Sequence, residues 1–237
     1  MRVIQRSFVW TGNAEKKKWA LVAWNKLCKS KNLGGLNLLD PSTISRTCGA
    51  KLWWRWLKEP NLPWAKHWKE KYAPGYSNQD LIRMQESPDG SPIWNLARRN
   101  REIVQEHSFW EIRDGETALF WEDAWQQFSK LGGPEFADLQ RQCQEMGRTT
   151  VNQYWNHSSR DQEWREWMFN ETKNTTEANI NVRDLLNLLN KRKIRKVDDK
   201  DQLRWGKKGS GNFTLKEARD HLENLEQIEE VQWSNKV

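Results

Sequence analysis

The carboxylate pairs of this chain are the groups that could hold a catalytic metal, and their context argues against that role. Polymerisation of nucleotides needs two or three carboxylates that hold Mg²⁺ against a triphosphate. Asp198 and Asp199 come closest to such a pair, but they follow the basic run 191–196 and precede Lys200. This context is typical of a solvated charge cluster, so we expect no metal site there.

The thiol and imidazole groups show no catalytic pattern either. Cys28, Cys48 and His67 could in principle form a nucleophile and its base, but a lone cysteine at an apolar helix position such as Cys48 is usually part of a core. The histidines lack metal-ligand spacing, and the glycines after Trp205 fit neither the dinucleotide-binding nor the P-loop pattern. We therefore predict no catalytic, cofactor-binding or metal-binding residue in this chain.

Basic and aromatic residues concentrate in the first third of the chain. Residues 1–72 contain 15 Lys and Arg against 4 Asp and Glu, whereas residues 73–237 contain 24 against 28. Lysine and arginine bind phosphates without sequence preference, and exposed aromatic rings stack on bases. The sequence thus predicts a nucleic-acid surface formed by Lys16, Lys17, Lys18, Lys29, Lys31, Lys51, Trp54, Arg55 and Lys58, with a second basic run at Lys191, Arg192, Lys193, Arg195 and Lys196.

The aromatic rings of this region have two possible roles. Helical spacing of Ile44, Leu52 and Trp56 indicates that most of the rings face a core. Trp54 lies off that stripe among basic residues, so we expect its ring to be exposed. Two alternatives stay open: the lysines form an ordinary solvated face, and the run 191–196 acts as a nuclear localisation patch.

Composition limits the class of protein. The chain has 237 residues, 36% of them hydrophobic, and 17 tryptophans, which favours small cores centred on tryptophan over one large aliphatic core. It has no run of about 18 apolar residues and no apolar segment at its start, so neither a membrane span nor a secretory signal is expected. Three scattered cysteines indicate a reducing compartment. We expect a nuclear or cytoplasmic location, with an organellar one less favoured.

Periodicity predicts a mainly α fold with two small β-hairpins, that is, an α+β chain with tryptophan-centred cores. Helices are expected over 42–57, from Pro63 through Tyr72, and from Pro92 to 104 with Ser91 as the N-cap. One hairpin is expected where 108–113 and 117–121 flank an Asp-Gly turn, and another where 203–205 and 212–215 flank a glycine-rich turn. Thr214 begins a capping box for a last helix.

The same features divide the chain into four segments. These are a basic tryptophan-rich helical region (1–72), a helix plus a hairpin (73–129), a polar linker or insertion (130–181), and a basic segment with a hairpin and a helix (182–237). The final residues carry no helix-stop signal, and we expect them to continue into a longer protein.

Several blocks resemble plant LINE-type, non-LTR retrotransposon reverse transcriptases. FVW at 8–10, LVAWNKLC at 21–28, KSKNLGGLNLLD at 29–40 and AKLWWRWL at 50–57 are similar to the region just after that family's polymerase thumb. FWEIRDGETALFWEDAW at 109–125 resembles its W-x-I-G-D-G-x-x-I-x-F-W-x-D-x-W block. DQLRWGKKGSGNFTLKEARDHL, from 201 onward, resembles the start of its C-terminal zinc-binding region.

The resemblance implies kinship with a polymerase without its activity. This sequence has no F/Y-x-D-D motif, no endonuclease block, and none of the Cys and His ligands of the family's zinc region. We therefore expect a non-enzymatic fragment that binds RNA or DNA non-specifically. The alternatives are a protein-interaction or structural role, and one piece of a split reverse transcriptase that complements a separate polymerase chain.

Overall fold

The computed structural model describes residues 2–12, 19, 21–29, 31, 34–126, 130–131, 133–156, 163–164, 185, 187–189, 199–206 and 211–223. The chain forms two compact units, one of Met1–Val104 with Phe213–Val237 and the other of Gln105–Asn212. We call them the first and the second unit. The four-segment division given by composition stays a prediction.

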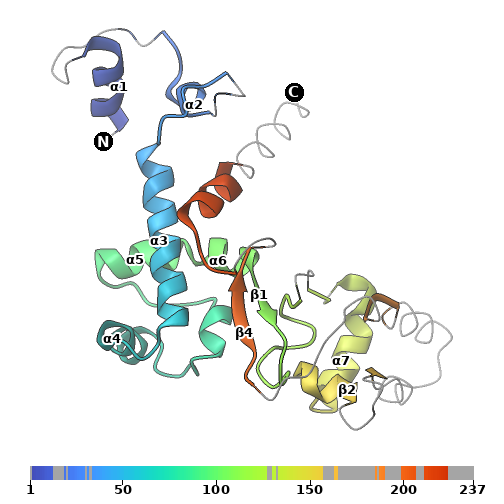
Figure 1. The fold of residues 1–237 in the computed structure, drawn as a ribbon. Helices are drawn as coiled ribbons and strands as arrows, with labels where there is room; N and C mark the ends of the chain where they lie inside the picture. The colour runs from blue at the N-terminus through green and yellow to red at the C-terminus, as the bar shows by residue number, and fades with distance from the viewer. Residues whose placement is uncertain are drawn as a thin grey trace. The chain divides into compact units, whose positions relative to one another are not determined.

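The first unit is helical (Figure 1). Its elements are α1 (Arg2–Thr11), α2 (Trp24–Cys28), α3 (Pro41–Lys58), α4 (Pro63–Tyr72), the 3-10 turn η2 (Asp80–Arg83), α5 (Pro92–Arg99) and most of α6 (Arg101–His107), followed late in the chain by a helix at 215–223. Proline occupies the first helical position of α3, α4 and α5, where its missing N–H has no helical partner to lose. The helices predicted over 42–57 and from Pro63 through Tyr72 are confirmed. The helix predicted from Pro92 to 104 is divided in two, because α5 ends at Arg99, where the Asn100 amide donates to the Ala97 carbonyl at 3.1 Å, and α6 begins at Arg101.

Tryptophans form the core of the first unit. Trp53, Trp56 and Trp94 are fully buried. The ring of Tyr72 stacks on Trp94 at 4.2 Å with an interplanar angle of 8°, and Trp68 meets Trp94 edge-on at 5.1 Å. The indole N–H of Trp94 donates to the Pro88 carbonyl at 2.9 Å, which satisfies a polar group that burial would otherwise leave without a partner.

Small residues let α3 approach α5 closely. Gly49 faces α5, and a Cβ at this position would lie 2.5 Å from the Leu96 carbonyl oxygen and 2.7 Å from the Asn100 side-chain nitrogen. Ala50, next to it, is fully buried. The buried side of α3 is therefore built around Gly49, Ala50 and Trp53 rather than around the stripe predicted from Ile44 and Cys48.

The second unit contains the described β-structure. β1 (Ser108–Glu111) pairs antiparallel with β4 (Gln202–Trp205), in a register that places Ser108 opposite Trp205 and Glu111 opposite Gln202. A second antiparallel pair joins β2 (Trp155–Asn156) to β3 (Glu163–Trp164). The mainly α fold with small antiparallel strand pairs and tryptophan-centred cores is confirmed.

Both predicted hairpin pairings are wrong. The partner of β1 is β4, more than 80 residues later in the sequence, and not 117–121. Residues 212–214 are not a strand, because Thr214 caps the helix at 215–223 instead: the Glu217 amide donates to its hydroxyl at 3.2 Å. The sequence thus indicated strands near 108–111 and 203–205, but it did not show that these two segments pair with each other, and the partners it gave them, 117–121 and 212–215, are not strands.

The segment predicted to be a polar linker contributes to the core of the second unit. It contains η3 (Pro134–Phe136), α7 (Ala137–Glu145) and η4 (Val151–Tyr154). Tyr154 is fully buried and stacks on Phe120 at 3.9 Å. In the described part of 130–156, most of the large apolar side chains are therefore core contacts, although Met146 is 43% exposed.

Within the parts of the chain that the structure describes, no helix is both long enough and apolar enough to cross a bilayer.

Candidate nucleic-acid interface

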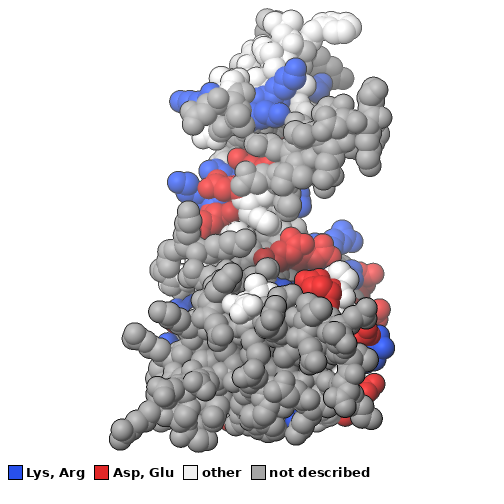
Figure 2. Space-filling model, turned by 90° about the vertical axis from the view of Figure 1, so that its right-hand side faces the viewer, with Lys and Arg blue, Asp and Glu red and all other residues white. Residues whose placement is uncertain are grey.

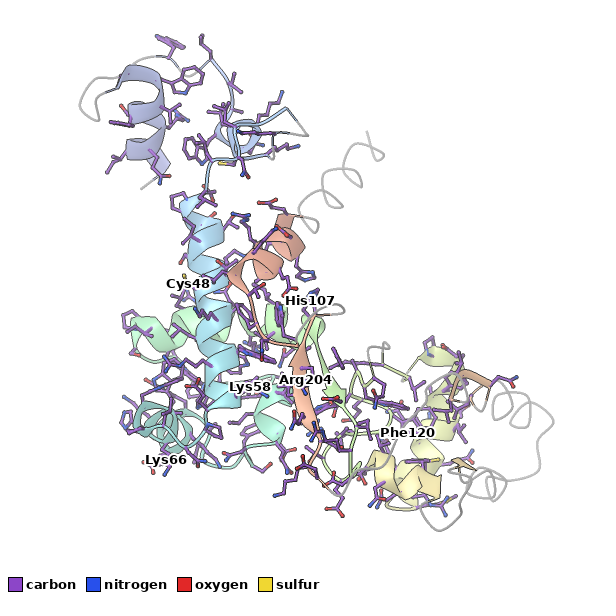
Figure 3. The ribbon with its side chains drawn as sticks, viewed as in Figure 1. Cys48, Lys58, Lys66, His107, Phe120 and Arg204 are labelled. Carbon is purple, nitrogen blue, oxygen red and sulfur yellow. The ribbon has the colours of Figure 1, made fainter. Side chains whose placement is uncertain are left out.

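Three predicted phosphate contacts share one exposed face of α3. Lys51, Arg55 and Lys58 follow each other at spacings of four and three residues, which places them on the same side of a helix. All three side chains are exposed. They extend over about 10 Å along the helix axis at about 1.5 Å per residue, and Figure 3 shows Lys58 near the end of α3. The helix thus presents a short row of cations to solvent.

The first turn of α3 is stabilised by contacts that do not involve the three cations. Asp40 is the N-cap, and its carboxylate accepts from the Ser42 amide at 3.1 Å. The same carboxylate accepts from the Trp24 indole N–H at 2.9 Å. The helix continues to Lys58, and the Glu59 amide closes the last turn on the Arg55 carbonyl at 2.9 Å.

Two of the cations also have local contacts. Arg55 pairs with Glu59 at 2.8 Å, with about half of each side chain exposed (54% and 46%), and its guanidinium lies 5.9 Å from the Trp64 ring centroid. The Lys58 ammonium lies 5.8 Å from the ring of Trp54. An exposed ion pair contributes only about 0–1 kcal/mol, so a phosphate can compete with Glu59 for Arg55.

Trp54 is buried, and the prediction that its ring is exposed is wrong. Its exposed fraction is 7%, and its ring lies 6.4 Å from that of Phe213. Phe213 is more than 150 residues away in the sequence, so the spacing of residues within α3 could not reveal this contact. Trp54 cannot offer a free face to a nucleic-acid base in this conformation.

Cys48 and Ile44 were predicted to face a core, but both are exposed. Cys48 is exposed (Figure 3), and the exposed fraction of Ile44 is 41%. Both lie on the side of α3 that carries Lys51 and Arg55, because 44, 48, 51 and 55 repeat at helical spacing. The face is therefore apolar in its first half and cationic in its second half.

Of the other predicted contacts, the structure describes Lys29 and Lys31, which follow α2 in the chain. Lys31 is exposed and Lys29 is half-buried, with the Lys29 carbonyl accepting from the Asn37 amide at 2.9 Å. Lys16, Lys17, Lys18, Lys191, Arg192, Lys193, Arg195 and Lys196 lie outside the described residues. The structure therefore brings together the contacts on α3 and leaves the other predictions untested.

Groups considered for catalysis have ordinary surroundings. Asp199 forms an ion pair with Arg113, a residue that is distant in the sequence. His67 is exposed on α4. Among the residues that the structure describes, no group of three His, Cys, Asp or Glu side chains is placed to hold a metal ion.

Asp201 is the charged residue that sequence reasoning missed. Its buried carboxylate accepts four backbone N–H groups of one loop, from Arg113 at 2.7 Å and Gly115 at 3.0 Å on one oxygen, and from Thr117 and Ala118 at 3.1 Å each on the other. Gly115 has a φ of +72°, which favours glycine. This contact connects β4 to the 113–118 loop. The block at 109–125 and the start of the block from 201 onward, both quoted above for their resemblance to reverse transcriptases, therefore have a structural role here.

Other residues of the 109–125 block are also structural. Trp110, Phe120, Trp121 and Trp125 are all buried. Asp123 accepts from the Leu119 amide at 2.8 Å. The tryptophans and aspartates in this block therefore stabilise a turn and a core and do not form a solvent-facing site.

A thiol and a phenol lie together in the core of the second unit. Burial raises the pKa of Cys143 and strongly raises the pKa of the neighbouring Tyr154. The Tyr154 hydroxyl donates to the Arg148 carbonyl at 3.1 Å and accepts from the Trp121 indole N–H at 3.1 Å. A thiol that stays protonated at neutral pH is a poor nucleophile, so this pair is structural.

Two plant proteins are similar to about half of the chain. A protein of Arabidopsis thaliana named "Putative ribonuclease H protein" is 32% identical over 122 residues, which cover 52% of this chain and 20% of that protein. An uncharacterized mitochondrial protein of the same plant is 28% identical over 119 residues, which cover 50% of this chain and 75% of that protein. The match thus spans about a fifth of the first relative and three quarters of the second. No protein-family model and no solved structure matches the chain.

Proposed function

We propose that this chain is a non-catalytic relative of part of a LINE-type reverse transcriptase and that it binds RNA or DNA weakly and without sequence preference. The motif blocks quoted above support the family, and the similarity to a protein named for ribonuclease H supports a nucleic-acid context. The proposed surface lies in the basic first third of the chain, with a balance of 15 cations to 4 anions in residues 1–72.

The observation that carries this proposal is the row of Lys51, Arg55 and Lys58 on α3. Cations on one helix face can neutralise neighbouring phosphates and release their counterions. Three contacts predict a modest affinity with a shallow salt dependence, a slope of log K against log salt of about −2 to −3, at about 0.7 per phosphate on single strands and about 0.9 on duplex DNA. Further lysines of the first third would steepen this slope.

The test is a titration of labelled single-stranded RNA and duplex DNA with the purified full chain, read by fluorescence anisotropy at several salt concentrations. The variant Lys51→Gln, Arg55→Gln, Lys58→Gln should bind both more weakly and with a shallower salt slope. The variant Lys200→Gln, Lys216→Gln is the control, because it removes exposed charges outside the proposed surface. An equal loss in both variants would refute an interface on α3.

A protein-interaction role is the second candidate, and a specific feature favours it. Ile44 and Cys48 expose apolar surface on the same face of α3. A partner that docks there would associate with little dependence on salt and would be sensitive to Ile44→Ser. The chain could also be one piece of a split reverse transcriptase that pairs with a separate polymerase chain; an adjoining reading frame that encodes the polymerase motif would favour this.

No catalytic, metal or membrane-binding function forms part of this proposal. We place the protein in the nucleus or the cytoplasm, where nucleic acid is accessible to it. Imaging of the tagged full chain, with and without the basic run at 191–196, checks the nuclear alternative.

A further inference from the structure

Arg55 is held in position by two neighbouring side chains. Its Nε donates to the Glu59 carboxylate at 2.8 Å, and its guanidinium carbon lies 5.9 Å from the centroid of the Trp64 ring. Glu59 is the C-cap of α3, and Trp64 lies in the first turn of α4. Contacts from two different elements therefore limit the conformations that this long side chain adopts.

Trp64 is a firm support for the guanidinium. The half-buried Trp64 ring meets Trp68 edge-on at 5.2 Å, and Trp68 meets the fully buried Trp94 edge-on at 5.1 Å. A guanidinium within about 6 Å of a tryptophan ring is attracted by the negative face of the ring. The position of Arg55 is thus tied to the tryptophan core of the first unit.

The terminal nitrogens of Arg55 are available to a ligand. A guanidinium carries five N–H donors in one plane, and Nε supplies one of them. Among the residues that the structure describes, Glu59 is the one hydrogen-bond acceptor for the Arg55 side chain, and it binds Nε. The two terminal nitrogens form a fork that matches two oxygens of one phosphate. A phosphate can therefore bind this fork without displacing Glu59.

Charge alone does not select a binding site, because cations are spread over the surface. Figure 2 shows Lys and Arg side chains at several places on one face of the molecule, some of them beside Asp and Glu. A mobile side chain loses rotamer freedom when it binds a phosphate, which weakens binding by about 2- to 13-fold for each side chain immobilised. Arg55 has lost much of this freedom before a ligand arrives.

We infer that Arg55 anchors the proposed surface and that its terminal nitrogens bind two oxygens of one phosphate of the nucleic-acid backbone. Glu59 and Trp64 are positioning residues that orient the guanidinium, while Lys51 and Lys58 contact the flanking phosphates as point charges. The inference rests on the proposed nucleic-acid binding and deepens it, because it assigns the mode of contact and the residue on which binding depends most.

Replacement of Arg55 by lysine keeps the charge and removes the fork. Arg55→Lys should weaken binding of labelled single-stranded RNA to the full chain by about 2- to 13-fold, with an unchanged salt slope because the number of cations is the same. Arg141→Lys is the matched control. Arg141 is also exposed and pairs with a carboxylate, that of Asp138 at 3.3 Å, but it lies outside the proposed surface. This control should bind RNA like the unchanged protein.

Two variants of Glu59 separate positioning from charge. Glu59→Gln and Glu59→Ala remove the same negative charge, but only glutamine still offers an oxygen to the Arg55 Nε. Glu59→Gln should therefore bind RNA about 2- to 13-fold more tightly than Glu59→Ala, and this difference should disappear in the Arg55→Lys background. Trp64→Leu should likewise weaken binding only while Arg55 is present, with circular dichroism to check the fold. In side-chain nitrogen NMR, the terminal N–H signals of Arg55 should shift when RNA is added, which a purely structural role would not cause.

The outcomes distinguish this inference from the proposal on which it rests. If Arg55→Lys binds RNA like the unchanged protein, or if the two Glu59 variants bind it equally, the anchor is overturned while nucleic-acid binding stands. If the folded, unchanged protein binds neither RNA nor duplex DNA at low salt, the proposed function itself fails. If it instead binds vesicles of anionic phospholipid, and Arg55→Lys weakens that binding, the phosphate belongs to a lipid and the assignment to nucleic acid is wrong.

Discussion

Replacement of Asp201 by asparagine should destabilise the second unit strongly. The carboxylate accepts four backbone N–H groups, two on each oxygen. Asparagine offers one oxygen and one NH₂ group, so two buried N–H donors lose their acceptor and face another donor in either orientation of the amide. Each such unsatisfied group costs about 1–3 kcal/mol, which gives about 2–6 kcal/mol in total. This is a large part of the roughly 5–15 kcal/mol that stabilises a typical protein.

Hydrogen exchange and denaturant unfolding measure this effect directly. In Asp201→Asn the amides of Arg113, Gly115, Thr117 and Ala118 should lose protection, and the free energy of unfolding of the second unit should fall. Asp199→Asn is the matched control, because Asp199 is a neighbouring but half-exposed carboxylate that pairs with Arg113. Its loss should cost at most about 1 kcal/mol. Full protection of the four amides in Asp201→Asn, with unfolding within about 0.5 kcal/mol of the unchanged protein, would refute this account of the loop.

Two further predictions concern close packing and pH. Gly49→Ala places a methyl group 2.5 Å from the Leu96 carbonyl oxygen, so it should lower the free energy of unfolding by about 1–3 kcal/mol. Gly75→Ala is the control, because no atom lies within 4 Å of its added Cβ. In denaturant titrations it should change the free energy of unfolding by less than about 0.5 kcal/mol. Burial raises the pKa of Cys143 and of Tyr154 in the folded protein. Their contribution to stability is therefore complete below the pKa values of the unfolded chain, about 8.5 for cysteine and about 10 for tyrosine. At higher pH this contribution is lost, because the unfolded chain ionises there before the folded protein does. Unfolding followed from pH 7 to 10.5 should show this fall, and Cys143→Ala should reduce its first part; a pH-independent stability would contradict the burial of these groups.

Helix ends and caps were predictable from the sequence because their signals are local. Pro63 and Pro92 begin helices as expected, and the Ser91 hydroxyl accepts from the Trp94 amide as an N-cap does. Ser91 also has a second role that no local pattern shows. Its amide donates to the Tyr72 hydroxyl oxygen and thereby lowers the pKa of Tyr72.

Long-range partners were not predictable from periodicity. Trp54 appeared exposed because its cover, Phe213, comes late in the chain. In the same way, residues 108–111 were paired with the nearest strand-like segment, although the Asp201 carboxylate holds the intervening loop and β4 supplies the partner strand. Hydrophobic spacing within a helix identifies which faces differ, but the distant residue that covers a face decides which of them is buried.

In the candidate site, too, the features that depend on local spacing were predictable and those that depend on long-range contacts were not. Lys51, Arg55 and Lys58 share a face because helical spacing alone dictates it, and the structure shows all three exposed. The assignment of the stacking ring depended on burial, which one sequence does not reveal.

The salt dependence of single-stranded RNA binding by the full chain tests the central claim most directly. We expect binding at about 50 mM salt that weakens steadily toward about 200 mM, with a slope that becomes shallower by about 2 when Lys51, Arg55 and Lys58 are replaced by glutamine, at about 0.7 per phosphate contact. A folded protein that does not bind RNA at low salt, or binds it with no dependence on salt, would contradict the proposed function.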